Sequence, residues 1–420
     1  MLMRQFLQDT IGGIIIIVLA LHPASQLSSI GRGSTGMEET SAYHLWVDAA
    51  NGNNSNNGLS AETALRTIQY AADLAQPGTT VHILPGVYRE SITPAESGQP
   101  DLVIRYVAEE GRGTVVIRGS EPSSSLVWSQ LTLNTIQLPP GVDPKNIYYT
   151  DISAWGLSEP PRFVVELDHS GEVVARMPLA REPDWAVTTD WKYHEFWWAA
   201  DGGKSAASCL PPIDTDPLDC DEPSRSLTQL TDLTDDTNPP GIEPGNLTTL
   251  ENLIGGTVVV VDTNTGHFTF RRKITAHDVP AGRITVGDKC EQGHGTDRPG
   301  LGWGSKYYIE DLPQLLDSPG EWWYERRTGR LYLWPRNTGN PSSMSIEISR
   351  RSDAFDLHNL SHITLDGLTI EFFSGIAIST VNTSYDKSHH NSVQNILLRY
   401  SNMGVWLSQY VDPTRQMICR

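Results

Sequence analysis

The sequence predicts an all-β protein whose strands stack into a solenoid, and three observations lead to this prediction. The 420 residues include 36 Gly and 27 Pro but only 19% charged residues, which is typical of a turn-rich β protein. Short β-type runs separated by glycines follow one another closely between residues 79 and 120. Residues 368–378 and 396–407 resemble each other, with their first seven positions aligned at an offset of 28. A strand–turn–strand repeat of this length cannot bury its own apolar face, so it must stack on neighbouring repeats.

The composition also excludes several classes of protein. Hydrophobic residues make up 38% of the chain and Trp occurs 12 times, which is incompatible with a disordered chain. The formal net charge of −19 repels polyanions, so we expect no nucleic-acid partner and no binding to anionic membranes. A polyanionic ligand would need a local basic patch or a bridging cation.

The N-terminus has the layout of a secretory signal peptide, predicted to span residues 1–25. Arg4 supplies a positive charge, and residues 11–21 form an uncharged apolar run that is much shorter than the roughly 20 residues of a membrane-spanning helix. The alternative is a signal anchor. We expect a secreted protein that has no membrane contact after the signal is cleaved.

Four cysteines fit an oxidising compartment. Cys209 and Cys220 bracket a polar loop, and we expect a disulfide between them to pin it. Cys290 and Cys419 remain, and the sequence does not determine whether they pair. No CxxC motif occurs, so no metal site is predicted at the cysteines. Four sequons offer possible glycosylation sites, at Asn53, Asn246, Asn359 and Asn382.

Residues 43–122 form the clearest unit. A strand begins at residue 43, and Ser60 is expected to cap a helix over residues 60–75 that Pro77 and Gly78 end. Three β runs follow, at residues 79–85, 102–108 and 114–120. One helix followed by closely spaced strands predicts a helix that caps the first turn of the solenoid.

Residues 123–340 interrupt this pattern and are predicted to form an aromatic-rich β insertion. We expect it to contain hairpins at residues 163–178 and 321–335 and strands at residues 257–262 and 267–274. Residues 201–250 are rich in Pro, Asp and Thr and read as a polar loop. The solenoid pattern returns at residues 341–410, and residues 411–420 read as an irregular tail.

The residues of the first and last units resemble a known family. The segments VDAANG, GLSAETALRTIQYAADLAQPGTTVHILPGVYRE and YVAEEGRGTVVIRGSEP look like the entry of secreted right-handed parallel β-helix proteins of the pectin-lyase-like superfamily. The segments EWWYERRTGRLYLWP and SHITLDGLTIEFFSG look like the return to the helix. The arrangement is similar to glycoside hydrolase family 120 β-xylosidases and covers nearly all of residues 43–407. The resemblance implies the fold more strongly than the activity, because this solenoid carries lyases, hydrolases, epimerases and adhesins.

The C-terminus departs from that family. Members continue through many further coils and a cap, whereas here the repeat stops after about two coils, and residues 411–420 are predicted neither to continue nor to cap it. The sequence therefore predicts a truncated chain, poorly stable by itself, with the family's catalytic carboxylates beyond Arg420.

Candidate catalytic residues lie in the last two repeats. The offset of 28 puts Glu371 and Arg399 in one column of a parallel sheet, where Arg399 would tune a catalytic Glu371 or grip a sugar carboxylate. The alternative is an ion-pair ladder, and alternation after Ile370 points Glu371 outward. The loop at residues 385–390 adds Asp386 and His389 for acid–base chemistry, or is simply a solvated loop.

Other residues are candidates for ligand binding. Sugar rings stack on aromatic side chains, so Trp191, Trp197 and Trp198 are candidate platforms, with a small hydrophobic core as the alternative. The acidic run Asp232, Asp235 and Asp236 would hold Ca²⁺ if the protein were a lyase, or is a flexible loop.

Together these residues predict a carbohydrate-active protein with a polysaccharide or oligosaccharide as its partner. The first hypothesis is a hydrolase of a neutral plant-type glycan, without a cofactor. The alternatives are a Ca²⁺-dependent lyase of pectate or alginate and a non-catalytic glycan-binding protein. The chain contains no Gly-rich phosphate loop, GxSxG or HExxH motif, so NTPase, serine-hydrolase and zincin chemistry have no support.

Overall fold

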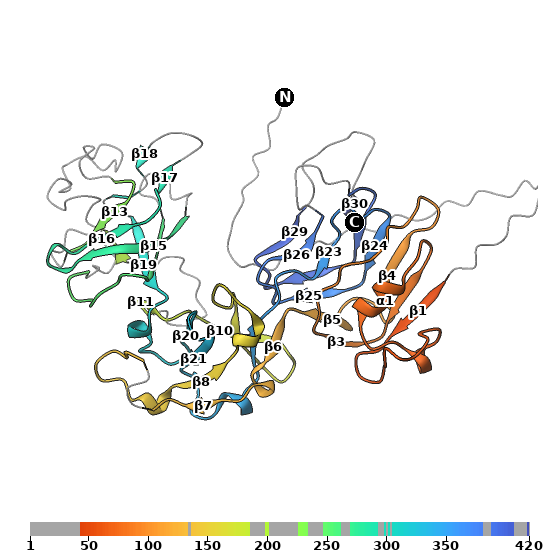
Figure 1. Cartoon of the computed structure of the whole chain (residues 1–420), viewed down its shortest axis with the longest axis horizontal. Helices are drawn as coiled ribbons and strands as arrows, with labels where there is room; N and C mark the ends of the chain where they lie inside the picture. Colours follow the sequence, from red (N-terminus) through yellow and green to blue (C-terminus); the bar gives the residue numbers. More distant parts are fainter. Residues whose placement is uncertain are drawn as a thin grey trace, which may run out of the picture. The chain divides into compact units, whose positions relative to one another are not determined.

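The computed structural model shows a mostly β protein with parallel and antiparallel sheets (Figure 1). It describes residues 43–132, 136–184, 198–200, 226–233, 247–261, 269–292, 298–299, 301–302, 305–380, 388–406 and 418–419. The chain divides into two compact units: unit 1 comprises Met1–Pro122, Pro161–Phe163 and Glu347–Arg420, and unit 2 comprises Ser123–Pro160 and Val164–Ile346. No helix within the described ranges is long and apolar enough to cross a membrane.

Unit 1 contains three parallel sheets that the chain visits in turn. The first runs in the order β1 (His44–Val47), β2 (Thr80–Ile83), β4 (Ile104–Ala108), β24 (Ile363–Asp366), β27 (Ser392–Gln394) and β30 (Ile418–Cys419). The second is β3 (Gly86–Tyr88), β5 (Val115–Arg118), β25 (Thr369–Glu371) and β28 (Leu397–Arg399). The third is β23 (Phe355–Asp356), β26 (Ile376–Ser379) and β29 (Met403–Trp406).

The register of the last two repeats confirms the predicted offset. Thr369 pairs with Leu397 and Glu371 with Arg399, both 28 residues apart. Strands from residues 43–122 (red to orange in Figure 1) lie beside strands from residues 347–406 (blue), because β24 pairs with β4. The predicted strands at 79–85, 102–108 and 114–120 are present as β2, β4 and β5.

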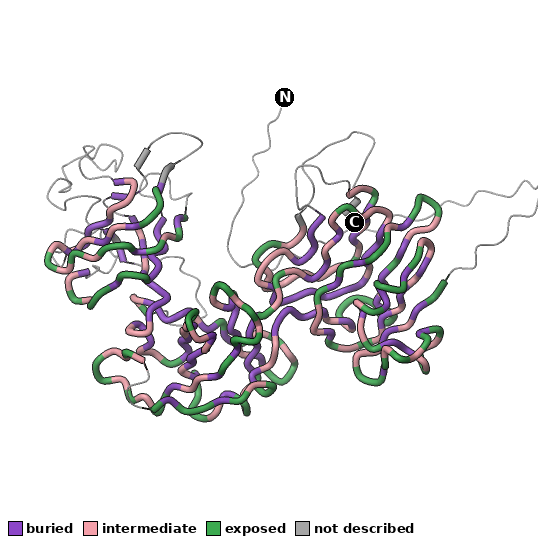
Figure 2. Tube along the Cα trace, viewed as in Figure 1, coloured by how far each residue is buried: buried purple, intermediate pink, exposed green. Residues whose placement is uncertain are grey.

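The core of unit 1 lies between these sheets. Alternating residues of each strand point inward, as in β4, where Ile104, Tyr106 and Ala108 are buried and Arg105 is exposed. Ile117 of β5 and Ile378 of β26 join the same fully buried cluster. Figure 2 shows buried positions (purple) recurring along the chain of unit 1. Each such aliphatic side chain stabilises the fold by roughly 1.5–3 kcal/mol relative to exposure.

The predicted helix at residues 60–75 is wrong at its start. A 3₁₀ turn, η1 (Ala61–Thr63), is followed by an extended bridge from Leu65 to Val47, and the helix α1 spans Ile68–Leu74. Thr67, not Ser60, is the N-cap: its side chain accepts a hydrogen bond from Tyr70 N. Leu65 fits the helical apolar pattern, but it is buried as part of an extended segment, so periodicity alone placed the start too early.

A short antiparallel pair is also part of unit 1. β6 (Ser120–Pro122) pairs with β22 (Ile346–Ser349), with Ser120 opposite Ser349 and Pro122 opposite Glu347. Within the predicted irregular tail at residues 411–420 only Ile418–Cys419 are described, and these two residues form β30, which pairs in parallel with β27. Ile396, Leu398 and Val405 pack against the core cluster and are partly buried.

Unit 2 is built from antiparallel strands, and the two predicted hairpins are confirmed in it. The first is β9 (Val164–Leu167) with β10 (Val173–Met177), and the second is β20 (Trp322–Glu325) with β21 (Arg330–Leu333). β21 continues to β8 (Tyr148–Asp151) and β7 (Ser129–Gln130). A larger sheet has the order β11 (Arg181–Glu182), β19 (Lys306–Glu310), β14 (Thr257–Val261), β15 (Thr269–Asp278), β16 (Arg283–Val286) and β13 (Gln229–Thr231).

The remaining elements of unit 2 are short. β12 (Trp198–Ala199) pairs with β19, and β17 (Glu291–Gln292) pairs with β18 (Arg298–Pro299). One-turn 3₁₀ helices are η2 (Ser123–Ser125), η3 (Pro144–Asn146), η4 (Ser153–Trp155), η7 (Val279–Ala281), η8 (Pro313–Leu315) and η9 (Pro341–Ser343). A second hydrophobic core includes Leu230, Val260, Ile309 and the free thiol of Cys290.

Candidate active site

The predicted Glu371 column exists, and its side chains form a buried ion-pair network. Arg118 Nε donates to Glu371 Oε1 at 2.7 Å, and Arg399 Nε donates to Glu371 Oε2 at 2.5 Å. Arg118 also reaches Glu347 Oε1 at 3.1 Å, and Arg89 binds both oxygens of Glu347 at 2.7 and 2.8 Å. Although burial opposes ionisation, the hydrogen bond and charge of Arg89 hold the pKa of Glu347 below its ordinary value.

Glu371 is more buried than the outward position expected from alternation implies. Its exposed fraction is 0%, and its carboxylate contacts Arg118 and Arg399. The reason is that Arg118, Arg399 and the neighbouring Glu347 of β22 cover this face of the second parallel sheet. Both carboxylate oxygens are already engaged, which favours the ion-pair ladder over a catalytic Glu371. The Nε of Arg399 likewise donates to Glu371, so this nitrogen does not grip a sugar carboxylate.

The other predicted site residues lie in different places. His389 contacts His390 and His362 at the start of the first parallel sheet, while Asp386 lies outside the described residues. Trp198 is 7% exposed and packs on Tyr307 in the core of unit 2, which matches the hydrophobic-core alternative. Asp232 is fully buried and accepts a hydrogen bond from the Tyr307 hydroxyl at 2.6 Å, so it is not part of a flexible loop.

Several predictions cannot be located. The predicted disulfide, two of the sequons, two of the tryptophans and two acidic residues lie outside the described residues: Cys209, Cys220, Asn246, Asn382, Trp191, Trp197, Asp235 and Asp236. The other two sequon residues, Asn53 and Asn359, are exposed. Cys419 lies in β30.

Four acidic residues of unit 2 meet at one place, which we call the carboxyl cluster: Glu182, Asp184, Asp317 and Glu321. The edge strand β11 ends at Glu182, and Asp184 follows it. Asp317 and Glu321 flank the turn before β20. Carboxylate oxygens of Glu182, Asp184 and Asp317 all lie within 4.8 Å of one another.

Backbone contacts fix the cluster. Glu321 is only 2% exposed, and its two oxygens accept hydrogen bonds from Arg181 N at 3.0 Å and Asp317 N at 3.3 Å. The Ser318 hydroxyl donates to Asp184. The guanidinium of Arg181 stacks 3.6 Å from the centre of the Tyr308 ring, and its Nε donates to Pro183 O. These contacts join the end of β11 to the turn before β20.

The environment of the cluster favours protonated carboxyls. Burial raises the pKa of Glu182 to about 7, with a further contribution from the charge of Asp184 and opposition from Arg181. Burial, then the charges of Asp184 and Glu182, raise the pKa of Asp317 to about 7. Burial and the charge of Asp184 also raise the pKa of Glu321 well above its ordinary value. Groups that hold and release a proton near neutral pH are suited to general acid–base catalysis.

Two of these side chains are available for further interactions. Asp317 Oδ1 is buried and has no hydrogen-bond partner among the described residues. The side chain of Glu182 makes no hydrogen bond within the part of the chain that the structure describes. A buried polar atom without a partner suits a site for a polar substrate, because a substrate hydroxyl or glycosidic oxygen can supply the missing hydrogen bond.

The raised pKa values predict that the protein loses stability as the pH rises. Carboxyls that bind protons more tightly in the folded state stabilise it fully below their unfolded pKa, and this stabilisation disappears as the pH approaches 7. Asp317→Asn has no proton to release. We therefore expect the free energy of unfolding of the variant, relative to wild type, to rise by about 1–2 kcal/mol from pH 5 to pH 8, after discounting for solvent screening. Urea denaturation of both proteins at pH 5 and pH 8 measures this difference. A pH-independent difference would contradict the raised pKa of Asp317.

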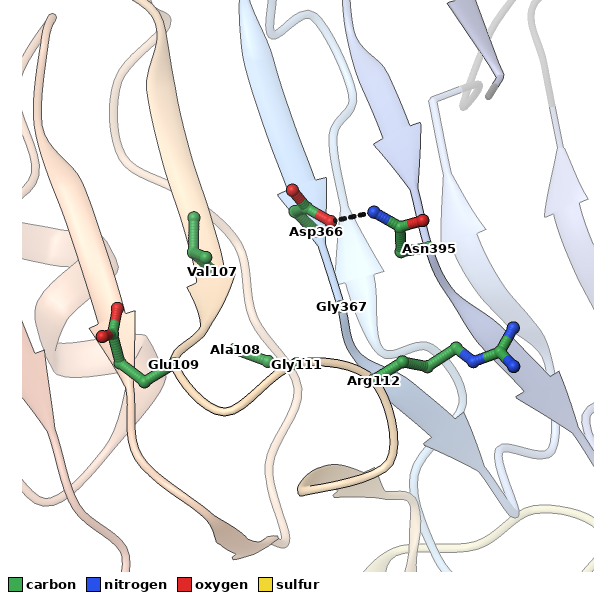
Figure 3. Close-up of a pocket in the computed structure, with 8 residues that line it drawn as sticks. All are labelled: Val107, Ala108, Glu109, Gly111, Arg112, Asp366, Gly367 and Asn395. Carbon is green, nitrogen blue, oxygen red and sulfur yellow. Dashed lines mark hydrogen bonds between the residues drawn. The ribbon is translucent and has the colours of Figure 1, made fainter. Parts of the chain in front are cut away.

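Unit 1 has a separate shallow pocket of about 320 Å³, shown in Figure 3. Its polar lining includes Glu109 and Arg112 from the loop after β4, and Asp366 and Asn395, which share a hydrogen bond of 2.8 Å. Glu109 also contacts His82. Since both carboxylates already have partners and the pocket is open to solvent, we consider it a weaker candidate for acid–base chemistry than the carboxyl cluster.

Sequence reasoning did not identify the carboxyl cluster. Its members lie in two short acidic segments, Arg181-Glu182-Pro183-Asp184 and Asp317-Ser318-Pro319-Gly320-Glu321, that are far apart in the chain. No spacing rule joins such segments, because only the antiparallel pairing of β11 with β19 and the bridge from Leu179 to Trp322 bring them together. The sequence feature that could have indicated the cluster is that both segments are acidic, contain a proline and are followed directly by a tryptophan.

Comparisons with known proteins give only distant likenesses. No protein-family model matches the chain, and no curated protein matches it. A solved structure described as "Glycoside hydrolase" is 15% identical with a TM-score of 0.46, covering 79% of this chain and 51% of that one. Another, described as "The complex structure of XylC with xylose", is 14% identical with a TM-score of 0.30, covering 83% and 40%. The chain thus spans about half the length, or less, of the solved structures it resembles.

Proposed function

We propose that this protein is a secreted enzyme that hydrolyses glycosidic bonds of a neutral plant-type polysaccharide or oligosaccharide. The observation that carries the proposal is the carboxyl cluster, in which two carboxyls have a pKa of about 7 and share their surroundings with a third. Glycoside hydrolysis uses a pair of carboxyl groups, one protonated and one ionised, on either side of the bond that breaks.

We also propose that the three parallel sheets of unit 1 are the faces of a right-handed parallel β-helix. The chain passes through β24, β25 and β26 and then through β27, β28 and β29, placing one strand of each set in each sheet. The shared core cluster lies between the sheets, and α1 adds Ile68, Ala71 and Ala72 to it. This arrangement supports an interpretation of unit 1 as a solenoid and of α1 as its cap.

Roles within the cluster follow from its contacts. Glu182 is the general acid, because its proton is not committed to a described hydrogen bond. Asp184 is the carboxylate that attacks the anomeric carbon, since it is exposed and is the charge that raises the pKa of both Glu182 and Asp317. Asp317 is the neighbouring carboxyl, with an oxygen within 4.8 Å of Asp184, and it positions Asp184.

The proposed reaction proceeds in two steps. Glu182 gives its proton to the glycosidic oxygen as the bond to the anomeric carbon breaks, and Asp184 forms a covalent bond to that carbon. Glu182, now ionised, takes a proton from water, and the resulting hydroxide displaces Asp184. Oxygens within 4.8 Å fit a retaining pair better than an inverting pair, whose carboxyl groups stand about 6.5–9.5 Å apart to admit water. We therefore expect the product to retain the anomeric configuration.

A neutral glycan suits the charge of the site better than a polyuronate. The protein carries a net charge of −19, and the cluster adds carboxyls whose neighbouring cation, Arg181, is only 4% exposed. A uronate carboxylate would be repelled here unless a cation such as Ca²⁺ bridged it. No cofactor is needed for the proposed hydrolysis.

A panel of xylan, arabinan, pectate and alginate tests the proposal with the full chain. We expect new reducing ends from xylan or arabinan, without ultraviolet absorbance and without a change on adding EDTA. Unsaturated, ultraviolet-absorbing products from pectate or alginate that require Ca²⁺ would instead identify a lyase. Binding to one of these glycans without any product would identify a non-catalytic glycan-binding protein.

A further inference from the structure

Three histidines of unit 1 lie together where the chain enters two neighbouring parallel strands. His362 directly precedes β24, and His389 and His390 precede β27. A bridge joins Ser361 to His389, and His362 N donates to His389 O at 3.3 Å. We propose that the imidazoles of His362, His389 and His390 form a binding site for a divalent transition-metal ion, for which Zn²⁺ is the probe.

The distances between the rings support this site. Ring nitrogens of the three histidines lie within 4.8 Å of one another, and His389 Nδ1 is 2.8 Å from His390 Nδ1. Around a tetrahedral zinc ion with bonds of about 2.0–2.1 Å, the ligand nitrogens stand roughly 3.4 Å apart. The nitrogens are therefore already close to the spacing of a coordination shell.

Only side-chain rotations are needed to aim the lone pairs. The rings of His362 and His390 are stacked, with centroids 4.9 Å apart and planes at 5°. The ring of His389 stands nearly perpendicular to both, at 88° and 89°. Nitrogen lone pairs lie in the ring plane, so the two parallel rings have to turn about their side-chain bonds for their lone pairs to meet that of His389.

The backbone holds the three residues in place before any metal binds. His362 and His390 occupy equivalent positions of successive repeats, and both are left-handed, with φ of 57° and 53°. Buried Asn391 ties the two turns together, because its Oδ1 accepts from Ile363 N at 3.0 Å and its Nδ2 donates to Leu360 O at 2.9 Å. A metal site with its ligands on fixed turns loses little conformational entropy on binding.

The nitrogen donors favour a transition-metal ion over Ca²⁺ or Mg²⁺. Three imidazoles suit zinc, copper or nickel, whereas Ca²⁺ and Mg²⁺ prefer oxygen ligands. Three protein ligands leave a fourth position of a tetrahedral ion for water or another group. The inference does not rest on the proposed function, because the carboxyl cluster belongs to unit 2.

Metal titration of the full chain tests the site. After EDTA treatment and removal of the chelator, we expect calorimetry to show one Zn²⁺ per chain, and Co²⁺ to give the visible absorption bands of tetrahedral coordination. Thermal unfolding should shift upward with Zn²⁺, because an ion that binds only the folded state stabilises it. Zn²⁺ that binds equally well to wild type and to the variants below would overturn the proposal.

The variants replace one ligand at a time. His362→Asn and His390→Asn keep a residue that tolerates the left-handed conformation, and His389→Gln keeps a polar side chain of similar reach. Each should weaken Zn²⁺ binding by about tenfold or more. His169→Asn, at an exposed histidine of unit 2, is the matched control and should bind as wild type does. Unfolding without metal, measured for every variant, shows whether a lost signal comes from a lost ligand or from a damaged fold.

Discussion

Glu182→Gln is expected to lower the rate of glycoside hydrolysis by about 10²–10⁴-fold, the usual contribution of a positioned general acid. The amide has nearly the same size as the carboxyl, so substrate binding should change little, but it cannot deliver a proton to the leaving oxygen. The effect should be on kcat rather than on KM, because proton transfer is completed only as the bond breaks.

The leaving group provides a sharper test of this role. A glycoside with a dinitrophenyl leaving group needs almost no protonation in the first step. On kcat/KM, which reports that step alone, Glu182→Gln should therefore lose far less with this substrate than with the natural glycan. Equal losses on both substrates would contradict the assignment of Glu182 as the acid. If Asp317→Asn shows the substrate-dependent loss instead, the acid is Asp317.

The pH profile gives an independent measurement. The acid must be protonated, and its pKa is about 7, so the wild-type kcat/KM should fall as the pH rises above 7. With the dinitrophenyl substrate this alkaline fall should disappear in Glu182→Gln. Glu166→Gln is the control in unit 2: Glu166 binds Arg336 at 3.0 Å, belongs to the hairpin of β9 and β10, and should leave rate and profile unchanged.

The local pattern of the sequence predicts the pairing of strands well. The offset of 28 follows directly from the repeated order of apolar and polar residues, and it correctly places Glu371 beside Arg399. The hairpin around Thr328 and Gly329 is equally local, because its turn residues and aromatic strands are adjacent in the chain.

What the sequence does not predict depends on contacts between distant segments. In the sequence Glu371 looks like an exposed polar residue. The residues that bury it, Arg118 and the Glu347 that pairs with Arg118 and Arg89, come from distant parts of the chain. The carboxyl cluster is hidden for the same reason, since Glu182 and Asp317 are brought together only by the fold. A pKa near 7 is a property of that shared burial and cannot be read from either segment alone.

The same distant contacts make Glu371→Ala the substitution with the largest expected effect on stability. The change removes the carboxylate between Arg118 and Arg399 and leaves two guanidinium groups without it, Arg118 with only 10% of its side chain exposed. Breaking a buried ion pair by removing one partner costs about 3–5 kcal/mol, because the remaining charge keeps its desolvation penalty. Guanidinium-chloride unfolding of the full chain measures the loss, with Glu110→Ala, at an exposed residue of unit 1, as the control.

A second variant separates the cost of an unpaired charge from the cost of a cavity. In Glu371→Leu/Arg399→Leu the carboxylate and one of its two arginine partners become apolar, so one guanidinium fewer is left unpaired and we expect the double variant to be more stable than Glu371→Leu alone. A cavity effect would instead make the double variant the less stable of the two. A loss below about 1 kcal/mol for Glu371→Ala would show that the pair behaves as an exposed ion pair does. It would reopen the possibility that Glu371 is available to a substrate, because a carboxylate that contributes little to the fold is free to act elsewhere.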